Sequence, residues 1–320
     1  MLRRHPRNPI LTRAQIPAIE PWIVDPTSVF NPGAVLHAGR VRLVLRVQTR
    51  GRRTHLVMAD SADGVDFTVE RRIVSLEGIE RAGGEIFHVY DPRITRLEGS
   101  CYLVVAMDTE AGCRMGLART RDFVSFEFLG VDEAREARNG VLFPERIGGR
   151  YLRLERPNRL DPGDGPLSGD EIVLAESPDL LSWRAVGVVA RGRPRYWDER
   201  IGSGPPPIKT RAGWLHIYHG VATHFGSVHI YQAGVLLLDL EDPSRLVARG
   251  SENILEPREP YELVGQVPNV VFPSGIVVRR EDGEGFALPE SEALIYYGAA
   301  DTCVGLATTT IAELLAACRR

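Results

Sequence analysis

A unit of two short apolar strands joined by a tight turn recurs five times along this chain, and this repeat constrains its fold most. In each copy a proline lies at or near the start of the first strand, and a turn or loop leads to the second. Repeats of a fixed period indicate an array of similar structural units, here roughly 60 residues long. The five prolines are Pro32, Pro92, Pro144, Pro207 and Pro273.

A third apolar strand follows each pair and ends, in most copies, in a turn that contains Asp and Ser. Side chains of these two residue types bind backbone amides in turns, so the turn is a structural part of the repeat. Five copies at this period predict an all-β fold, a five-bladed β-propeller. The turns are Ser61–Phe67, Thr120–Phe126, Ser177–Trp183 and Glu241–Ser244, and a truncated last copy follows Val304–Ala307.

Two tandem β-sandwiches are the structural alternative, but no linker-like segment divides the chain near its middle. We therefore expect a single domain over residues 1–320 with short terminal extensions. The clearest helical signal is confined to residues 311–319.

Composition disfavours several classes of partner. A formal net charge of -3 gives no reason to expect nucleic acid or an anionic membrane. No apolar stretch approaches the roughly 20 residues that span a bilayer, and no apolar segment follows the basic start, so we expect a cytoplasmic protein. The four cysteines lack metal-ligand spacing; we interpret them as reduced, partly buried thiols and expect no metal. They are Cys101, Cys113, Cys303 and Cys318.

The ends of the inner strands of a propeller lie around a central funnel, so polar residues there are candidate site residues. Dense charge in a concave site is expected where sugar hydroxyl groups are bound, although ion pairs between blades are the alternative for any one residue. Before the inner strands we find Asn31, Asp91, Glu145, Ser203 and Lys209, and after their neighbours Arg46, Asp108, Glu155, Arg156, His219 and Asp301.

Lys209 is the only lysine among the 39 basic residues. Lysine supplies a compact point charge that arginine does not, so this residue is a candidate for a specific role. Chance retention in an arginine-rich composition is the alternative.

Seven motifs together resemble those of the mannoside phosphorylases, glycoside hydrolase family 130. Their order and spacing cover nearly the whole chain. The resemblance implies phosphorolysis of β-mannosides with inversion, which gives α-mannose 1-phosphate and an acceptor sugar such as glucose, mannose or N-acetylglucosamine. The motifs are Val29–Ala34, Tyr90–Thr95, Arg138–Glu145, Gly202–Thr210, Tyr218–Val221, Asn269–Pro273 and Tyr296–Asp301.

The same resemblance implies a role for each site residue. Asp91 is the general acid and protonates the glycosidic oxygen through a mannose hydroxyl group. Inorganic phosphate is the co-substrate, and no other cofactor is implied. Phosphate is bound by Arg138, Arg156, Lys209 and Tyr231, while Asn31, Arg46 and Asp301 line the sugar pocket, with Asn139 and His219 as further candidates.

The chemistry agrees with this implication. An inverting hydrolase needs an acid and a base, whereas phosphate is already an anionic nucleophile and needs cations to hold it. A hydrolase on the same fold stays open, because Glu145, Glu155 and Glu199 are candidate bases. Glu155 would also repel phosphate unless it pairs with Arg156. A non-catalytic carbohydrate-binding propeller is the third reading, and a homo-oligomer is left open.

Overall fold

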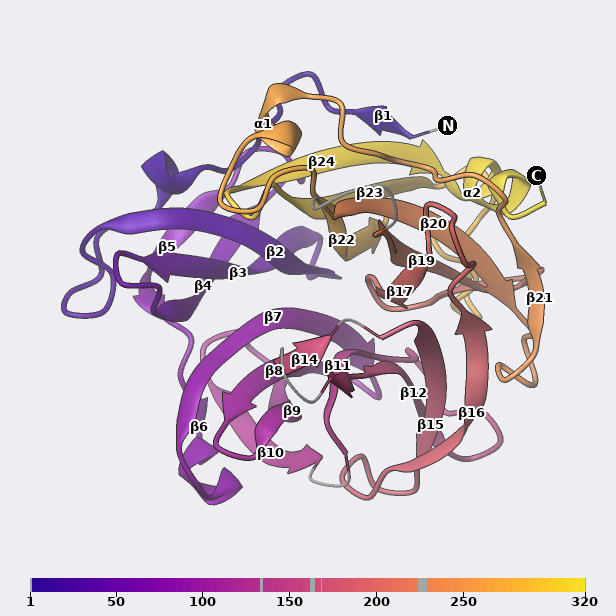
Figure 1. Ribbon diagram of the computed structural model, residues 1–320, viewed down its shortest axis with the longest axis horizontal. Helices are drawn as coiled ribbons and strands as arrows, with labels where there is room; N and C mark the ends of the chain where they lie inside the picture. The colour runs from indigo at the N-terminus through magenta and orange to yellow at the C-terminus, as the bar shows by residue number, and fades with distance from the viewer. Residues whose placement is uncertain (1, 133–134, 162–164, 168, 224–228, 320) are drawn as a thin grey trace.

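Five β-sheets are arranged as blades around a central axis in the computed structural model (Figure 1). The structure describes residues 2–132, 135–161, 165–167, 169–223 and 229–319. Each blade is built mainly from antiparallel neighbours in chain order, so the all-β, five-bladed prediction is confirmed.

Apart from the short edge strands β6 (Leu76–Glu77) and β1 (Arg3–Arg4), the strands of each blade follow one another in chain order from the axis outward (Figure 1). Blade 1 comprises β2 (Pro26–His37), β3 (Arg40–Thr49), β4 (Thr54–Ser61) and β5 (Thr68–Ile73). Blade 2 comprises β7 (Ile86–Leu97), β8 (Ser100–Thr109), β9 (Gly112–Thr120) and β10 (Phe126–Asp132), with β6 (Leu76–Glu77) at its edge. Blade 3 comprises β11 (Ala137–Leu142), β12 (Tyr151–Pro157), β15 (Glu171–Ser177) and β16 (Arg184–Arg191).

The last two blades differ slightly from this plan. Blade 4 has a divided inner strand, β17 (Arg200–Ser203) and β18 (Ile208–Thr210), followed by β19 (Gly213–Ala222), β20 (Ile230–Leu238) and β21 (Leu246–Arg249). Blade 5 comprises β22 (Val271–Val278), β23 (Glu292–Ala299), β24 (Cys303–Thr310) and β1 (Arg3–Arg4). The remaining elements are β13 (Arg159–Asp161), β14 (Gly165–Leu167), α1 (Pro260–Leu263), α2 (Ile311–Ala317), η1 (Arg13–Gln15) and η2 (Ile79–Ala82).

The expected Asp turns are present after the third strand of each of the first three blades. Asp63 Oδ1 accepts hydrogen bonds from the amides of the residues two and three positions later, both at 2.9 Å. Asp122 and Asp179 make the same pair of bonds. In blade 4 Asp239 does so, rather than Asp242 of the predicted turn.

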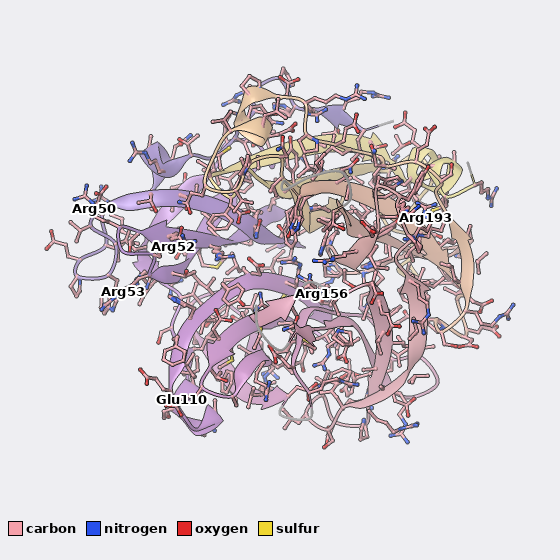
Figure 2. The ribbon with its side chains drawn as sticks, viewed as in Figure 1. Arg50, Arg52, Arg53, Glu110, Arg156 and Arg193 are labelled. Carbon is pink, nitrogen blue, oxygen red and sulfur yellow. The ribbon has the colours of Figure 1, made fainter. Side chains whose placement is uncertain are left out.

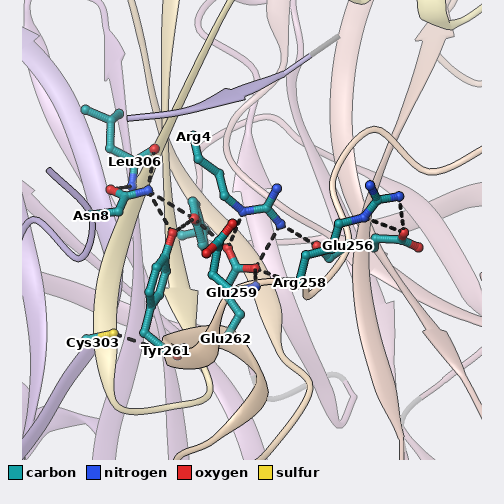
Figure 3. A network of polar contacts seen from close by, with 10 residues as sticks. Arg4, Asn8, Glu256, Arg258, Glu259, Tyr261, Glu262, Cys303 and Leu306 are labelled. Atoms are coloured by element: carbon teal, nitrogen blue, oxygen red, sulfur yellow. Dashed lines mark hydrogen bonds and ion pairs between the residues drawn. The ribbon is translucent and has the colours of Figure 1, made fainter. Parts of the chain in front are cut away.

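The N-terminal segment completes the fifth blade, which corrects the prediction of a truncated last copy. Strand β1 pairs with β24, so residues from both ends of the chain share one sheet. Arg4 makes two hydrogen bonds of 2.8 Å to the buried Glu262 carboxylate, which also accepts one from Tyr297 (Figure 3). Asn8 bonds to the backbone of Leu306 in both directions at 2.9 Å. These polar contacts hold the ring closed.

Apolar side chains fill the space between neighbouring blades. Phe143 and Trp214, for example, meet edge to face across blades 3 and 4, with ring centroids 5.1 Å apart. The predicted C-terminal helix is α2, capped by the Thr310 side chain, which accepts from the amide of Glu313. Cys101, Cys113, Cys303 and Cys318 are all buried and free of disulfide bonds. None of the helices in the described residues is long and apolar enough to cross a membrane.

Candidate active site

Three inner strands carry the same β-bulge, and each bulge places a polar residue at one end of the axis. The register shifts between Phe30 and Gly33, and equivalent shifts occur in β7 and β11. The bulged residues Asn31, Asp91 and Asn139 have φ angles of 47°, 49° and 54°. Asn and Asp adopt this left-handed conformation more readily than other side chains, and bulges re-aim side chains beside functional sites.

These bulges correct the proline alignment made from the sequence. Pro32 and Pro92 follow the bulged residue directly, but Gly140 occupies the equivalent place in β11. Pro144 lies beyond the end of β11, and Pro207 lies between β17 and β18. Residues next to these two prolines therefore do not share the position of Asp91.

The Asp91 carboxylate is held from blade 1. Its Oδ1 accepts hydrogen bonds from Asn31 Nδ2 at 2.9 Å and from Arg46 Nη1 at 2.8 Å. No described residue donates to Oδ2, and 14% of the side chain is exposed. Burial alone would raise the pKa of Asp91, but Arg46, Arg93 and the Asn31 bond outweigh it and lower this pKa. The carboxylate is thus ionised, with one oxygen free for a ligand.

The Tyr90 ring connects Asp91 with the next part of the site. The guanidinium carbon of Arg46 lies 4.7 Å from the ring centroid, and that of Arg138 lies 6.0 Å from it. The Tyr90 hydroxyl donates to Asp108 Oδ1 at 2.7 Å. In the sequence, Tyr90 stood out only as part of a motif. Its position directly before the proposed acid is the signal that could have identified it as a site residue.

Arg138 and Arg156 face each other across the β11–β12 ladder. Arg138 Nη2 lies 3.8 Å from Asp108 Oδ1, so it has only a distant anionic partner there. Arg156 is only 6% exposed and lies near the centre of the ring (Figure 2). Burial and the neighbouring Arg138 charge lower the pKa of Arg156 to about 10. Two charges of the same sign that face each other on neighbouring strands destabilise a sheet. An anion bound between them removes this repulsion.

Tyr231 and His219 lie on the blade 4 side of these arginines. The two rings are 6.2 Å apart, and His219 is 4.6 Å from the Phe272 ring. Burial, followed by the charge of Arg156, lowers the pKa of His219 well below its usual value. A Cβ atom on Gly202 would lie 2.8 Å from both Asn139 Oδ1 and His219 Nε2, so only glycine leaves room for these two side chains.

Asp301 reaches the site from the turn between β23 and β24. Burial raises the pKa of Asp301 to about 6; the Arg46 charge opposes this shift and the Asp91 charge adds to it. These interactions place Asp301 near both residues. The structure thus brings together Asn31, Arg46, Asp91, Arg138, Asn139, Arg156, His219, Tyr231 and Asp301 at one end of the axis.

Lys209 does not lie in this group. Its Nζ is 2.7 Å from Glu145 Oε2 and 4.4 Å from the centroid of the Phe286 ring. Both charged residues line a cavity of about 270 Å³ together with Thr95 and Arg96, which lie further along β7 than Asp91. The cavity is therefore at the opposite end of the inner strands, where the misaligned prolines Pro144 and Pro207 also lie.

The other candidate bases are engaged elsewhere. Glu155 is fully buried, and its carboxylate binds Arg153 Nε at 3.0 Å and Arg135 Nε at 2.7 Å. Its partner is therefore not Arg156, whose side chain points to the other face of the strand. Glu199 accepts hydrogen bonds from the backbone and hydroxyl groups of Thr223. Within the described ranges, no group of three or more metal-binding side chains is placed to hold an ion.

Comparison with known proteins first defines the class: the chain is similar to curated phosphorylases that act on mannosides. The beta-1,4-mannooligosaccharide phosphorylase of Ruminococcus albus is 32% identical over 319 residues, which is 98% of this chain and 89% of that protein. The 1,2-beta-oligomannan phosphorylase of a Thermoanaerobacter species is 32% identical over 302 residues, 90% of this chain and 91% of its own.

The family follows from the remaining comparisons. The solved beta-1,2-mannobiose phosphorylase of Listeria innocua, in complex with beta-1,2-mannobiose, aligns with a TM-score of 0.84 at 27% identity and 99% coverage of both chains. Residues 1–320 match the family described as beta-1,4-mannooligosaccharide phosphorylase. The chain belongs to this family, glycoside hydrolase family 130.

Proposed function

We propose that this protein is an inverting β-mannoside phosphorylase. Phosphate attacks the anomeric carbon, the bond from this carbon to the glycosidic oxygen breaks, and the oxygen takes a proton that Asp91 supplies through a mannose hydroxyl group. The products are α-mannose 1-phosphate and the acceptor sugar. The observation that carries the proposal is the facing pair Arg138 and Arg156 in blade 3, with Arg138 lying against Tyr90, the residue directly before Asp91.

The arginine pair suits a phosphate dianion. Guanidinium groups can bind phosphate with two parallel hydrogen bonds each, and Tyr231 lies close enough to interact with Arg156. Because the curated relatives of this chain are phosphorylases, inorganic phosphate is the co-substrate in the proposal. Lys209 is left out of the phosphate site, since it pairs with Glu145 at the other end of the axis.

The ionised state of Asp91 fits a reversible reaction. In the synthetic direction Asp91 must accept a proton, and Arg46 keeps the carboxylate charged for this purpose. In the phosphorolytic direction the carboxyl group must carry a proton. Binding of the phosphate dianion favours this protonated state of Asp91, because a nearby negative charge raises the pKa of a carboxyl group.

The mannose side of the site is formed by blades 1 and 5 in this proposal. Asn31 and Arg46 fix Oδ1 of Asp91, so Oδ2 is left to contact the sugar hydroxyl that relays the proton. Asp301 accepts from further hydroxyl groups when ionised. Asn139 and His219, which meet at Gly202, bind the sugar or phosphate from blades 3 and 4.

The three glutamates considered as bases for a hydrolase are all engaged in other contacts. Glu145 pairs with Lys209, Glu155 pairs with Arg153 and Arg135, and Glu199 bonds to Thr223. An inverting hydrolase needs a carboxylate about 6.5–9.5 Å from the acid that can activate water. These pairings favour phosphorolysis over hydrolysis.

We also propose that residues 1–320 form one catalytic domain that acts in the cytoplasm on a small oligosaccharide. The protein acts as a monomer or as a homo-oligomer. Support for the domain comes from the family match over the whole chain. The relatives do not indicate which glycosidic linkage this protein cleaves. Proteins that act on 1,4- and 1,2-linked mannosides are equally similar to this chain, at 32% identity.

A test incubates the enzyme with β-1,4-mannobiose, β-1,2-mannobiose and β-1,4-mannosyl-glucose, each with and without phosphate. We expect cleavage of at least one sugar only with phosphate, with α-mannose 1-phosphate as product. Equal cleavage in both conditions, with free mannose as product, would show hydrolysis. Binding without cleavage of any β-mannoside would favour a carbohydrate-binding propeller.

A further inference from the structure

Arg93 extends from blade 2 across the centre of the propeller to blades 4 and 5. It belongs to β7 in blade 2, yet its Nε donates to the carbonyl oxygen of Gly204 in blade 4 at 2.8 Å. Its guanidinium carbon lies 5.3 Å from the ring centroid of Phe272 in blade 5. The residue is only 1% exposed, so one buried cation contacts three blades.

The same guanidinium holds the backbone of the Asp91 bulge. Arg93 Nη1 lies 3.3 Å from the carbonyl oxygens of both Asp91 and Pro92. Asp91 has a φ angle of 49°, a conformation that costs free energy outside glycine and persists where the surroundings fix it. The hydrogen bonds that Arg93 donates to these two carbonyl groups fix the backbone of Asp91 in this conformation.

The inner strands approach one another closely around Arg93. A Cβ atom on Gly33 would lie 2.9 Å from the Pro92 carbonyl oxygen in β7, and one on Gly204 would lie 3.2 Å from the Pro273 carbonyl oxygen in β22. Strands packed this tightly transmit a small displacement of Arg93 to the bulge.

A buried cation also needs a reason to be retained, since desolvation of a charge is costly. Burial lowers the pKa of Arg93 to about 10, and Asp91 opposes that shift. Asp91 is the one anionic group that interacts with Arg93 among the described residues. His216, also buried, lies within electrostatic range and is neutral, because burial and then Arg93 lower its pKa to about 3.

We propose that Arg93 is a positioning residue for the general acid: it fixes the backbone of the Asp91 bulge and supplies a permanent charge near the carboxylate. This inference rests on the proposed function for the role of Asp91. The charged groups that face Asp91 are Arg46 from β3, Arg93 from β7 and Asp301 from the β23–β24 turn. Those that face Arg93 are Asp91, His216 and His219.

The first test measures the carboxyl titration of Asp91 by NMR in protein labelled with ¹³C at Asp, with the resonance assigned from Asp91→Asn. In Arg93→Met we expect the titration midpoint of Asp91 to rise by about one pH unit or more. In Arg93→Lys, which keeps a charge, we expect a smaller rise. An unchanged midpoint in folded Arg93→Met would overturn the electrostatic part of the proposal.

The second test uses kinetics. In Arg93→Lys a single ammonium nitrogen replaces the separate Nε and Nη1 donors that contact the three carbonyl groups. We therefore expect kcat to fall about tenfold or more with little change in the KM for sugar. Wild-type kcat in this variant would overturn the positioning role, and Arg93→Lys keeps the proposal testable if Arg93→Met does not fold. Arg249→Met is the matched control, because Arg249 is also a largely buried arginine but binds Asp198 and Tyr218 rather than Asp91. We expect Arg249→Met to lower the melting temperature and leave the Asp91 titration midpoint and kcat unchanged.

The two proposals fail in different ways. The NMR titration uses protein without substrate, so its result does not depend on which reaction is catalysed. A raised Asp91 midpoint together with phosphate-independent cleavage would contradict the proposed function alone. Phosphorolysis by the wild type with no effect of either Arg93 variant would contradict the Arg93 proposal alone.

Discussion

Arg138 and Arg156 occupy directly opposite positions on β11 and β12, so two guanidinium groups share one face of the sheet. Like charges at such positions destabilise a sheet, and here the second charge is almost fully buried. An anion bound between the two guanidinium groups attracts both of them, so the net electrostatic interaction becomes favourable. The pair is therefore suited to bind an anion.

Replacing one member of the pair should weaken phosphate binding. In Arg156→Met we expect the KM for phosphate to rise about 10- to 100-fold, because a hydrogen bond to a charged group contributes about 1.5–3 kcal/mol. Initial rates at saturating sugar and varied phosphate measure this. Lys209→Met is the control and should keep its phosphate KM, since Lys209 binds Glu145 instead. A larger effect in Lys209→Met than in Arg156→Met would contradict this assignment.

Removing the proposed acid should abolish turnover but keep sugar binding. In Asp91→Asn we expect kcat to fall by about 10²–10⁴, the usual contribution of general acid catalysis. The amide can still accept from Arg46 through its oxygen, so the site should keep its shape. Stopped assays give kcat, and calorimetry gives the affinity for the disaccharide. Near wild-type kcat in Asp91→Asn would exclude it as the acid.

Asp301 should make stability depend on pH. Its folded pKa is about 6, above the unfolded value, so its contribution is complete below pH about 4 and is lost as pH rises through 6. Asparagine does not titrate, so the Asp301→Asn variant does not lose this stability as the pH rises. We expect the variant to match the wild type at pH 4 and to exceed it at pH 7.5, by up to about 3 kcal/mol for a shift of about two pKa units.

Urea unfolding at the two pH values measures this difference. Asp122→Asn is the control of opposite sign, because hydrogen bonds from the amides of Val124 and Ser125 lower the pKa of Asp122. That variant should lose stability relative to the wild type at neutral pH. A wild-type protein as stable as Asp301→Asn at pH 7.5 would show that Asp301 is not held in a desolvated environment.

The contact between Arg4 and Glu262 should control closure of the ring. Arg4→Ala leaves the fully buried Glu262 carboxylate without its cation, and we expect a loss of about 3–5 kcal/mol. The double variant Arg4→Met, Glu262→Gln removes both charges and should recover part of that loss. Urea unfolding measures both variants. Equal stability of Arg4→Ala and the wild type would mean that β1 does not close the fifth blade in solution.

Much of the fold was predictable from local sequence, because hairpins and Asp turns are encoded by adjacent residues. Gly39 and Gly99 take positive φ angles in tight turns, as the sequence indicated, and Asp63 binds the amides just after it. The closing strand was not predictable in this way. Two residues at the N-terminus pair with β24 about 300 positions away, and nothing local marks them as a strand.

The site was predictable where the bulge is followed by proline, as at Asn31 and Asp91. It was harder to align at Asn139, where glycine follows instead. Pro144 and Pro207 resemble the other prolines in sequence but lie outside the bulges, and this alignment placed Glu145 and Lys209 among the candidate site residues. The family resemblance then implied the phosphate role of Lys209. The contact of Arg93 with blade 4 depends on the closed ring, so sequence alone gave no sign of it.

A crystal of the enzyme soaked in phosphate tests the central claim most directly. We predict an anion bound between the guanidinium groups of Arg138 and Arg156, next to Tyr231 and on the side of the sugar pocket that faces Asp91. An anion bound instead at Lys209, or an unoccupied arginine pair at a phosphate concentration that supports full activity, would contradict the account.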